Sequence, residues 1–180
     1  DALIADGVRL ADGEVVRADV VVVGIGVSPA TDWLAGSGVE LRDGIVCDAH
    51  LNVLDANGDV VPGVFAAGDV ARWPNGLFDE EMLVEHWTNA AEQGAHAANN
   101  LVHLAAGEAP EPYAPLPFFW SDQFEHRIQF LGRAGADDDV CIVAGSVADA
   151  KFLTLFGRDG RLHGARGLNA PRWVMSTRKL

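Results

Sequence analysis

Residues 61–69 read VPGVFAAGD, and this stretch decides the fold. A Pro-Gly turn leads into a short apolar run, which predicts a buried strand over Val64–Ala67. Gly68 and Asp69 follow at the carboxyl end of that strand. Ligands of open α/β sheets bind at the carboxyl ends of strands, so Asp69 is placed to meet one. Glycine lets a ligand approach the backbone, and a carboxylate accepts hydrogen bonds from hydroxyl groups, so a polyol fits this chemistry.

The residues before this stretch contain further strand patterns. Val20–Val23 is a continuous β-branched run, which is typical of a strand buried on both faces of a parallel sheet, and it ends at Gly24-Ile25-Gly26. Shorter elements are expected as a hairpin over 8–16 with a tight two-residue turn at Asp12-Gly13, a helical stretch over 31–35, strands over 44–47 and 51–54, and a turn over 55–59.

The second half of the chain changes in character. A helix is predicted from about Trp87 to Leu104, and its small residues suggest a face packed closely on a sheet or a cofactor: Ala90, Ala91, Gly94, Ala97, Ala98 and Leu101. Four prolines in 109–117 indicate a linker. Antiparallel strands are then expected over 127–131, 140–144, 152–156 and 162–166, with Asp159-Gly160 as a turn and Pro171 in the first turn of a final helix.

Composition favours a cytoplasmic protein. The 180 residues are 49% hydrophobic with a mean hydropathy of +0.11, and no apolar run approaches the ~18 residues that span a bilayer. The first residues lack a basic region leading into an apolar stretch, so no signal peptide is expected. Cys47 and Cys141 stand far apart and form no CxxC pair, so we expect two buried or half-buried thiols and no metal site.

The net charge of −13 is distributed unevenly. Residues 151–180 hold seven of the 13 Lys and Arg and one of the 26 Asp and Glu, a net of +6, which leaves −19 on residues 1–150. The acidic body would repel nucleic acid, and no nucleic-acid partner is expected. The basic end is either a solvated face or a surface that attracts an acidic partner.

The stretch over 61–69 resembles the second flavin-binding fingerprint of the pyridine nucleotide-disulfide oxidoreductase superfamily. This resemblance implies that Asp69, next to Gly68, binds the ribityl hydroxyls of FAD. Val20–Gly26 is similar to the strand and glycine turn that end the NAD(P)H domain, so Gly24, Ile25 and Gly26 are expected near NAD(P)H. The turn is not a GxGxxG motif, because Pro29 stands where the third glycine would fall.

Residues 84–94, VEHWTNAAEQG, resemble the segment that opens the helix facing the flavin ring in ferredoxin reductases of oxygenase systems. The resemblance implies that Glu85, His86 and Trp87 lie near the flavin ring and the nicotinamide. Trp87 could instead be a core aromatic under the helix. We expect His86 to be a packing or surface residue rather than a proton donor, because hydride transfer to flavin needs no histidine.

Residues 118–123 (FFWSDQ) and 127–132 (RIQFLG) are similar to the first strands of the small C-terminal domain in the same reductases. Apoptosis-inducing factors share part of this pattern. Trp120 matches the tryptophan that covers the flavin edge near the ferredoxin docking surface; the alternative is an ordinary aromatic between two domains.

The resemblance implies incomplete FAD- and NAD(P)-binding Rossmann-like α/β domains followed by a small α+β C-terminal domain with an antiparallel sheet. The expected divisions are 1–27 for the end of the NAD(P)H domain, 28–109 for part of the FAD domain and 110–180 for the C-terminal reductase domain. The family's first GxGxxG is not in the sequence, so we expect these 180 residues alone to bind FAD weakly and to be inactive.

The expected activity is electron transfer from NAD(P)H through FAD to a ferredoxin, without a catalytic acid or base. The alternatives are an NADH oxidase or peroxidase-like flavoprotein and a non-catalytic interaction protein similar to apoptosis-inducing factor. The ferredoxin is expected at the basic C-terminal end, and a homodimer is left open. The candidate docking residues are Arg158, Arg161, Arg166, Arg172, Arg178 and Lys179.

Overall fold

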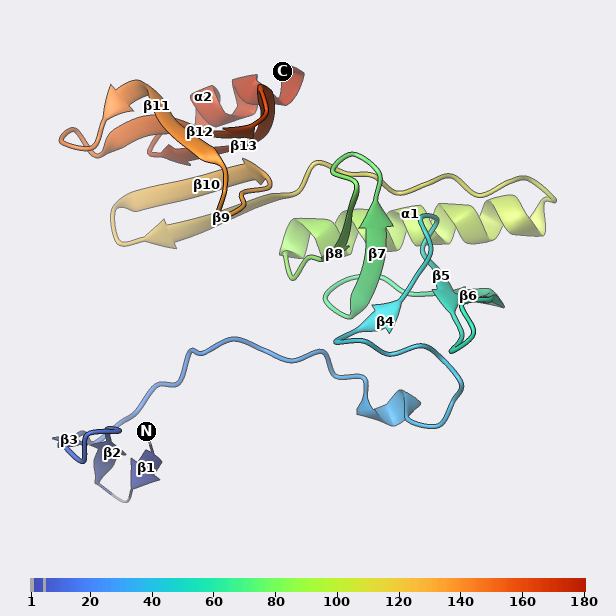
Figure 1. Cartoon of the computed structure of the whole chain (residues 1–180), viewed down its shortest axis with the longest axis horizontal. Helices are drawn as coiled ribbons and strands as arrows, with labels where there is room; N and C mark the ends of the chain where they lie inside the picture. The colour runs from blue at the N-terminus through green and yellow to red at the C-terminus, as the bar shows by residue number, and fades with distance from the viewer. Residues whose placement is uncertain (1, 5) are drawn as a thin grey trace.

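The computed structural model describes residues 2–4 and 6–180 (Figure 1). The chain opens with a small antiparallel sheet of β1 (Ala2–Ile4), β2 (Gly7–Arg9) and β3 (Val15–Arg17). The expected hairpin is confirmed, with Val8 opposite Val16. The tight two-residue turn is wrong: five residues connect the strands, closed by a bond from Leu10 N to Glu14 O (2.8 Å). A positive φ is found at Gly13 (91°) but not at Asp12.

The buried strand expected over Val20–Val23 is wrong. Val20 is 78% and Val22 is 90% exposed, and residues 18–31 contain no strand. A β-strand needs a neighbour to satisfy its amide and carbonyl groups, and no described segment pairs with this one. Figure 1 shows it as an extended trace that leads from β3 to the 3₁₀ turn η1 (Asp32–Leu34), which confirms the helical stretch expected there.

A second region begins with β4 (Ile45–Val46) and continues with the hairpin of β5 (Asn52–Leu54) and β6 (Val60–Phe65). The turn expected over 55–59 is confirmed, since the Asp55 carboxylate accepts the amides of Asn57 (2.8 Å) and Asp59 (3.0 Å). The buried strand expected over Val64–Ala67 is wrong: Val64 is exposed and the strand ends at Phe65. With β5 as its one neighbour in the described structure, β6 leaves most of its side chains uncovered.

Two strands that the sequence patterns did not indicate complete this region. β7 (Ala71–Asn75) pairs parallel with β4 and antiparallel with β8 (Glu80–Leu83). The signal for β7 was its alternation, because Ala71, Trp73 and Asn75 are buried while Pro74 is exposed. The core around Trp73 is formed by Ile45, Cys47, Leu51, Val53, Ala66, Ala71, Met82, Val84, Ala97 and Tyr113.

The expected helix is confirmed as α1 (Trp87–Ala105), but its buried face differs from the predicted one. Of the six residues of the predicted face, Ala97 alone is buried, and the other buried positions are the polar residues Asn89, Gln93 and Asn100. Polar side chains can be buried there because each meets partners; Asn100, for example, donates to His50 O (2.9 Å) and Glu111 O (2.9 Å).

Residues 106–117 contain no helix or strand, as expected of a linker, and two of them, Tyr113 and Pro117, are buried. This strap runs back along α1 toward the last sheet (Figure 1). Tyr113 is buried within it, 5.6 Å from the Trp73 ring between centroids, and its hydroxyl donates to Asn89 Oδ1 (3.2 Å). The Trp73 indole N–H donates to Tyr113 O (3.1 Å), so the strap closes one side of the core.

The antiparallel C-terminal strands are confirmed. The order is β11-β12-β13-β10-β9, and the bounds are β9 Phe118–Gln123, β10 His126–Gly132, β11 Asp139–Ser146, β12 Lys151–Arg158 and β13 Arg161–Leu168. Asp159 (φ 53°) and Gly160 (φ 73°) form the expected turn. The final helix α2 (Pro171–Ser176) has Pro171 in its first turn and continues into η2 (Thr177–Lys179).

The α2 helix covers one face of this sheet. A Cβ added to Gly167 would lie 2.4 Å from Val174 Cγ2, so glycine in β13 is what lets the helix approach this closely. Val174 packs with Leu131, Leu153 and Ala165 into a second core. Among the described residues, no helix is both long and apolar enough to cross a bilayer.

Candidate functional site

Gly68 and Asp69 lie between β6 and β7, beside the first turns of α1. Gly68 N donates to Gln93 Oε1 (2.7 Å), and a Cβ added to Gly68 would meet Ala90 Cβ at 3.4 Å. The φ of Gly68 is 80°, a conformation that favours glycine, so the turn requires this residue, and the helix lies at ordinary contact distance from it. The arrangement fixes Asp69, whose carboxylate is exposed, next to the beginning of the helix.

His86 stands immediately before α1 in an extended conformation, and its side chain does not cap the helix. The amide groups of residues 87–89 have no acceptor inside the helix, and they give its start a partial positive charge. Burial lowers the pKa of the His86 imidazole, and the nearby Asp69 and Glu85 carboxylates oppose this only in part. The ring is therefore neutral at pH 7, and it packs 4.8 Å from Phe119 between centroids.

Two tryptophans from different elements meet at this end of the helix. The Trp87 and Trp120 rings are 6.5 Å apart between centroids in an edge-to-face arrangement. Thr88 Oγ1 donates to Phe118 O, which ties the first turn of α1 to β9. Trp87 is 77% exposed, so it is not a core aromatic of the described structure, and Trp120 is 39% exposed. Together they form an aromatic rim beside the helix start.

The glycine turn at 24–26 is not part of this grouping. Ile25 is 90% exposed, and a Cβ added to Gly24 or Gly26 would meet no atom within 4 Å. The role of these three residues toward NAD(P)H stays a prediction. The structure thus brings together six of the nine site residues expected from the sequence: Gly68, Asp69, Glu85, His86, Trp87 and Trp120.

Sequence reasoning missed two residues that shape the site. Gln93 is fully buried and positions Gly68, and its signal was the spacing of polar residues along one helix face at 89, 93 and 100. Arg127 places its guanidinium carbon 5.7 Å from the centre of the Trp120 ring, and the residue opposite it on β9 is Asp122. This contact depends on the pairing of β9 with β10, and no local sequence pattern could have indicated it.

The polar atoms around Gly68 fit a flavin. Gln93 Nε2 and His86 Nδ1 are buried without a hydrogen-bond partner in the described structure, so each is available to a bound molecule. The Asp69 carboxylate offers acceptors to the hydroxyls of a polyol chain, and the amides at the start of α1 offer donors to ring carbonyl oxygens. Acceptors, donors and an aromatic rim are all within one small region.

Comparison with known proteins places the chain in a family. Residues 2–94 match the family model described as pyridine nucleotide-disulphide oxidoreductase, and residues 118–180 match the model described as reductase C-terminal. The chain belongs to the pyridine nucleotide-disulphide oxidoreductase family. The α/β fold class with an antiparallel C-terminal sheet, expected from the sequence, is therefore confirmed.

Relatives within this family include the ferredoxin–NAD(+) reductase component of the anthranilate 1,2-dioxygenase system of Burkholderia cepacia (38% identity, 92% of this chain, 38% of that protein). The rhodocoxin reductase of Rhodococcus erythropolis is 36% identical over 98% of this chain and 38% of its own length. The chain therefore spans about 38% of the length of these curated relatives. The domain divisions at 27/28 and 109/110 stay predictions.

Solved structures of the family superpose well on this chain. The ferredoxin reductase for the CYP199A2 system from Rhodopseudomonas palustris has a TM-score of 0.86 at 32% identity, covering 99% of this chain and 42% of that one. The covalent putidaredoxin reductase–putidaredoxin complex gives 0.76 at 28% identity over 94% of this chain and 38% of that one.

Proposed function

We propose that the full-length protein is an FAD-dependent NAD(P)H:ferredoxin reductase, the electron-transfer component of an oxygenase system. The observation that carries the proposal is the grouping of Asp69, the uncapped start of α1 and the Trp87–Trp120 rim. The relatives named as ferredoxin reductases support it. When bound, FAD would supply the redox chemistry, taking a hydride from NAD(P)H and passing single electrons onward.

The residues of this chain would bind and orient the flavin. Asp69 accepts hydrogen bonds from ribityl hydroxyls, and Gln93 holds the Gly68 turn that presents Asp69. The amides of residues 87–89 donate to the ring carbonyls, where their partial positive charge favours negative charge on the ring. Trp87 and Trp120 cover the exposed edge and limit water there. Gly24, Ile25 and Gly26 contribute to the NAD(P)H site.

No residue of the site is assigned a proton-transfer role. Burial keeps the pKa of His86 below its ordinary value, so its imidazole is neutral at pH 7, with Nδ1 buried. His86 instead packs on Phe119 and fixes the angle at which the chain enters α1.

The ferredoxin is proposed to dock at the basic C-terminal end, beside Trp120. The six candidate residues do not form one patch. Arg158 pairs with Asp138, and Arg166 lies over Phe156 with its guanidinium carbon 5.5 Å from the ring centre. Arg172 is exposed on α2, which covers the same sheet face that carries Trp120. Arg172, together with Arg127 over the Trp120 ring, is therefore the best-placed cation for an acidic partner.

The test is electron transfer by the full-length protein to cytochrome c, with and without added [2Fe–2S] ferredoxins, with NADH and NADPH in parallel. A ferredoxin reductase reduces cytochrome c only when a ferredoxin is present. Rapid oxygen or peroxide consumption without ferredoxin would instead assign an oxidase or peroxidase. A colourless protein that oxidises neither nucleotide, even after incubation with FAD, would overturn both enzymatic assignments.

A further inference from the structure

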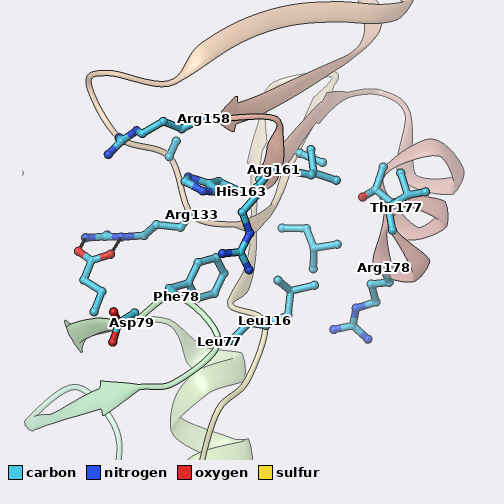
Figure 2. Close-up of a pocket in the computed structure, with 18 of the residues that line it drawn as sticks. Leu77, Phe78, Asp79, Leu116, Arg133, Arg158, Arg161, His163, Thr177 and Arg178 are labelled. Atoms are coloured by element: carbon cyan, nitrogen blue, oxygen red, sulfur yellow. Dashed lines mark hydrogen bonds and ion pairs between the residues drawn. The ribbon is translucent and has the colours of Figure 1, made fainter.

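A cleft with a volume of about 970 Å³ lies on the face of the C-terminal sheet that α2 covers. It opens between the β7–β8 turn (76–79) and the ends of β10 and β13, with η2 on one side (Figure 2). Its apolar lining includes Phe78, Leu116 and Leu131, and Arg133, Arg158, Arg161 and Arg178 supply its positive charge. No part of the proposed flavin site lines it.

Two of these arginines are held in place by carboxylates. Arg133 makes a two-pronged pair with Glu80 across the cleft, with Nε donating to Oε2 at 3.0 Å. Arg158 donates from one guanidinium nitrogen to Asp138 Oδ1 (2.9 Å). The Asp138 side chain has no exposed surface and also accepts the amide of Gly135 (2.7 Å), so its position is fixed. These pairs build a rigid wall and cancel the charge of its two arginines.

Arg161 and Arg178 are the cations that remain. Neither makes an ion pair in the described part of the chain, whereas both line the cleft. Figure 2 shows Arg161 reaching into the middle of the cleft above Phe78 and Leu116, with Arg178 facing it from the other side. Asp79 on the turn is the one side-chain carboxylate of the described lining outside these pairs, so two unpaired arginines face one carboxylate in the cleft. The Nε atom of Arg158 is also buried without a hydrogen-bond partner there.

We propose that this cleft binds a small organic anion. Its carboxylate or phosphate group lies between Arg161 and Arg178, and its apolar body lies on Phe78, Leu116 and Leu131. Arginine suits either group because its planar guanidinium donates two parallel hydrogen bonds. The volume is within the range of ligand clefts, about 300–1,000 Å³, and exceeds the need of an inorganic ion. The site does not depend on flavin binding or on ferredoxin docking.

The test is isothermal titration of the full-length protein with four probes: octyl phosphate, octanoate, inorganic phosphate and octanol. Both octyl anions are expected to bind, with inorganic phosphate and octanol at least tenfold weaker because each lacks one half of the recognition. A preference between the octyl anions identifies the natural head group. Equal binding of phosphate and octyl phosphate would overturn an organic ligand, and no binding of either anion would overturn the site.

The matched variants are Arg161→Gln and Arg172→Gln, which remove one positive charge from the same end of the chain, inside and outside the cleft. Arg161→Gln should weaken the octyl anions roughly ten- to a hundred-fold, since a charged hydrogen-bond partner is lost, and Arg172→Gln should change binding less than twofold. A thermal melt confirms that both variants fold. If both variants lose the same affinity for the octyl anions, the effect is due to net charge alone, and the site is overturned. Lost ferredoxin binding in Arg161→Gln, without binding of either anion by the unmodified protein, would assign Arg161 to docking.

Discussion

Asp69 is exposed, and its position depends on the residue before it. The buried bond from Gly68 N–H to Gln93 Oε1 (2.7 Å) holds the turn against α1, and the positive φ of Gly68 (80°) favours glycine at that position. An aspartate placed in this way has a fixed backbone and a carboxylate open to a ligand. Removal of the carboxylate and removal of its support should therefore have different effects.

Asp69→Ala in the full-length protein should reduce FAD retention without unfolding the chain. Hydrogen bonds to a charged acceptor are worth about 1.5–3 kcal/mol, which corresponds to a ten- to hundred-fold loss of affinity. Flavin content after dialysis measures the effect. The matched control is Asp59→Ala, which removes an exposed carboxylate at the other end of β6. Wild-type occupancy in the Asp69 variant would leave the residue as part of a turn only.

Gln93→Leu should destabilise the protein itself. The Gly68 amide would lose its acceptor in a buried position, at a cost of about 1–3 kcal/mol. Urea unfolding, followed by tryptophan fluorescence, gives the change in free energy of unfolding. Gln93→Glu keeps an acceptor oxygen and serves as the comparison. If Gln93→Leu unfolds at the same urea concentration as the unmodified protein, the bond contributes nothing to the turn.

The grouping of site residues could be predicted from the sequence only in part. Local strings indicated Gly68, Asp69 and the residues that open α1, because each string is a contiguous motif. Gln93 and Arg127 act through contacts 25 residues away and across two strands, and no local pattern encodes such contacts. The roles of all these residues toward FAD and NAD(P)H stay predictions.

The strap over 106–117 has a structural role that its sequence did not predict. Four prolines predicted a linker, and the segment contains neither helix nor strand. Its Tyr113, however, is buried between Trp73 and α1, and burial raises the pKa of the phenol. The strap therefore stabilises the core as well as connecting two regions.

Tyr113→Phe should lower the free energy of unfolding by about 1 kcal/mol, because the ring stays in place while the bond to Asn89 Oδ1 is lost. Chemical denaturation with an unchanged slope checks this. The comparison is Tyr113→Ala, which also removes the packing on Trp73 and should cost about 3–5 kcal/mol. If the Phe variant loses as much free energy of unfolding as the Ala variant, the hydroxyl rather than the ring provides most of the stability.

Elements whose partners are close in sequence were predicted well. Each C-terminal strand pairs with a neighbour in the same 63-residue stretch, and their turns and alternation are local. The buried strand predicted over Val20–Val23 was wrong because an apolar pattern indicates burial only where other segments cover it, and these residues are exposed. The polar face of α1 was missed because hydrogen-bond partners from the strap and from His50 make it a buried face.

Charge is separated along the molecule, with +6 on residues 151–180 against −19 on the rest. Exposed charges act mainly on the rate of encounter with a charged partner and on its salt dependence. In the cleft wall, Asp138 and Glu80 neutralise Arg158 and Arg133. The Gly135 amide and then Arg158 lower the pKa of Asp138, and the hydrogen bond from Arg133 lowers the pKa of Glu80. Long-range attraction is therefore assigned to the unpaired cations.

Arg172→Glu should raise the KM of the full-length protein for ferredoxin and flatten its dependence on ionic strength. Reduction of ferricyanide should be unchanged, because a small acceptor needs no docking face. Arg9→Glu, a charge reversal on β2 far along the chain, is the matched control. If both activities of the Arg172 variant fall together, the arginine supports the fold, and if neither changes over a salt series, ferredoxin docks elsewhere.

Gly167 sets the thickness of the C-terminal region. One methyl group there would meet Val174 Cγ2 at 2.4 Å and act as a wedge under α2. Gly167→Ala should therefore cost about 1–3 kcal/mol in thermal unfolding, as overpacking does. Val174→Ala would restore the space, so the double variant should be more stable than the two single losses added together predict. If the stability losses of the two single variants simply add in the double variant, residues 167 and 174 are not in direct contact. Because α2 leads straight into η2, which carries Arg178 on the wall of the cleft, a displacement of α2 by a methyl group at residue 167 would move that wall as well.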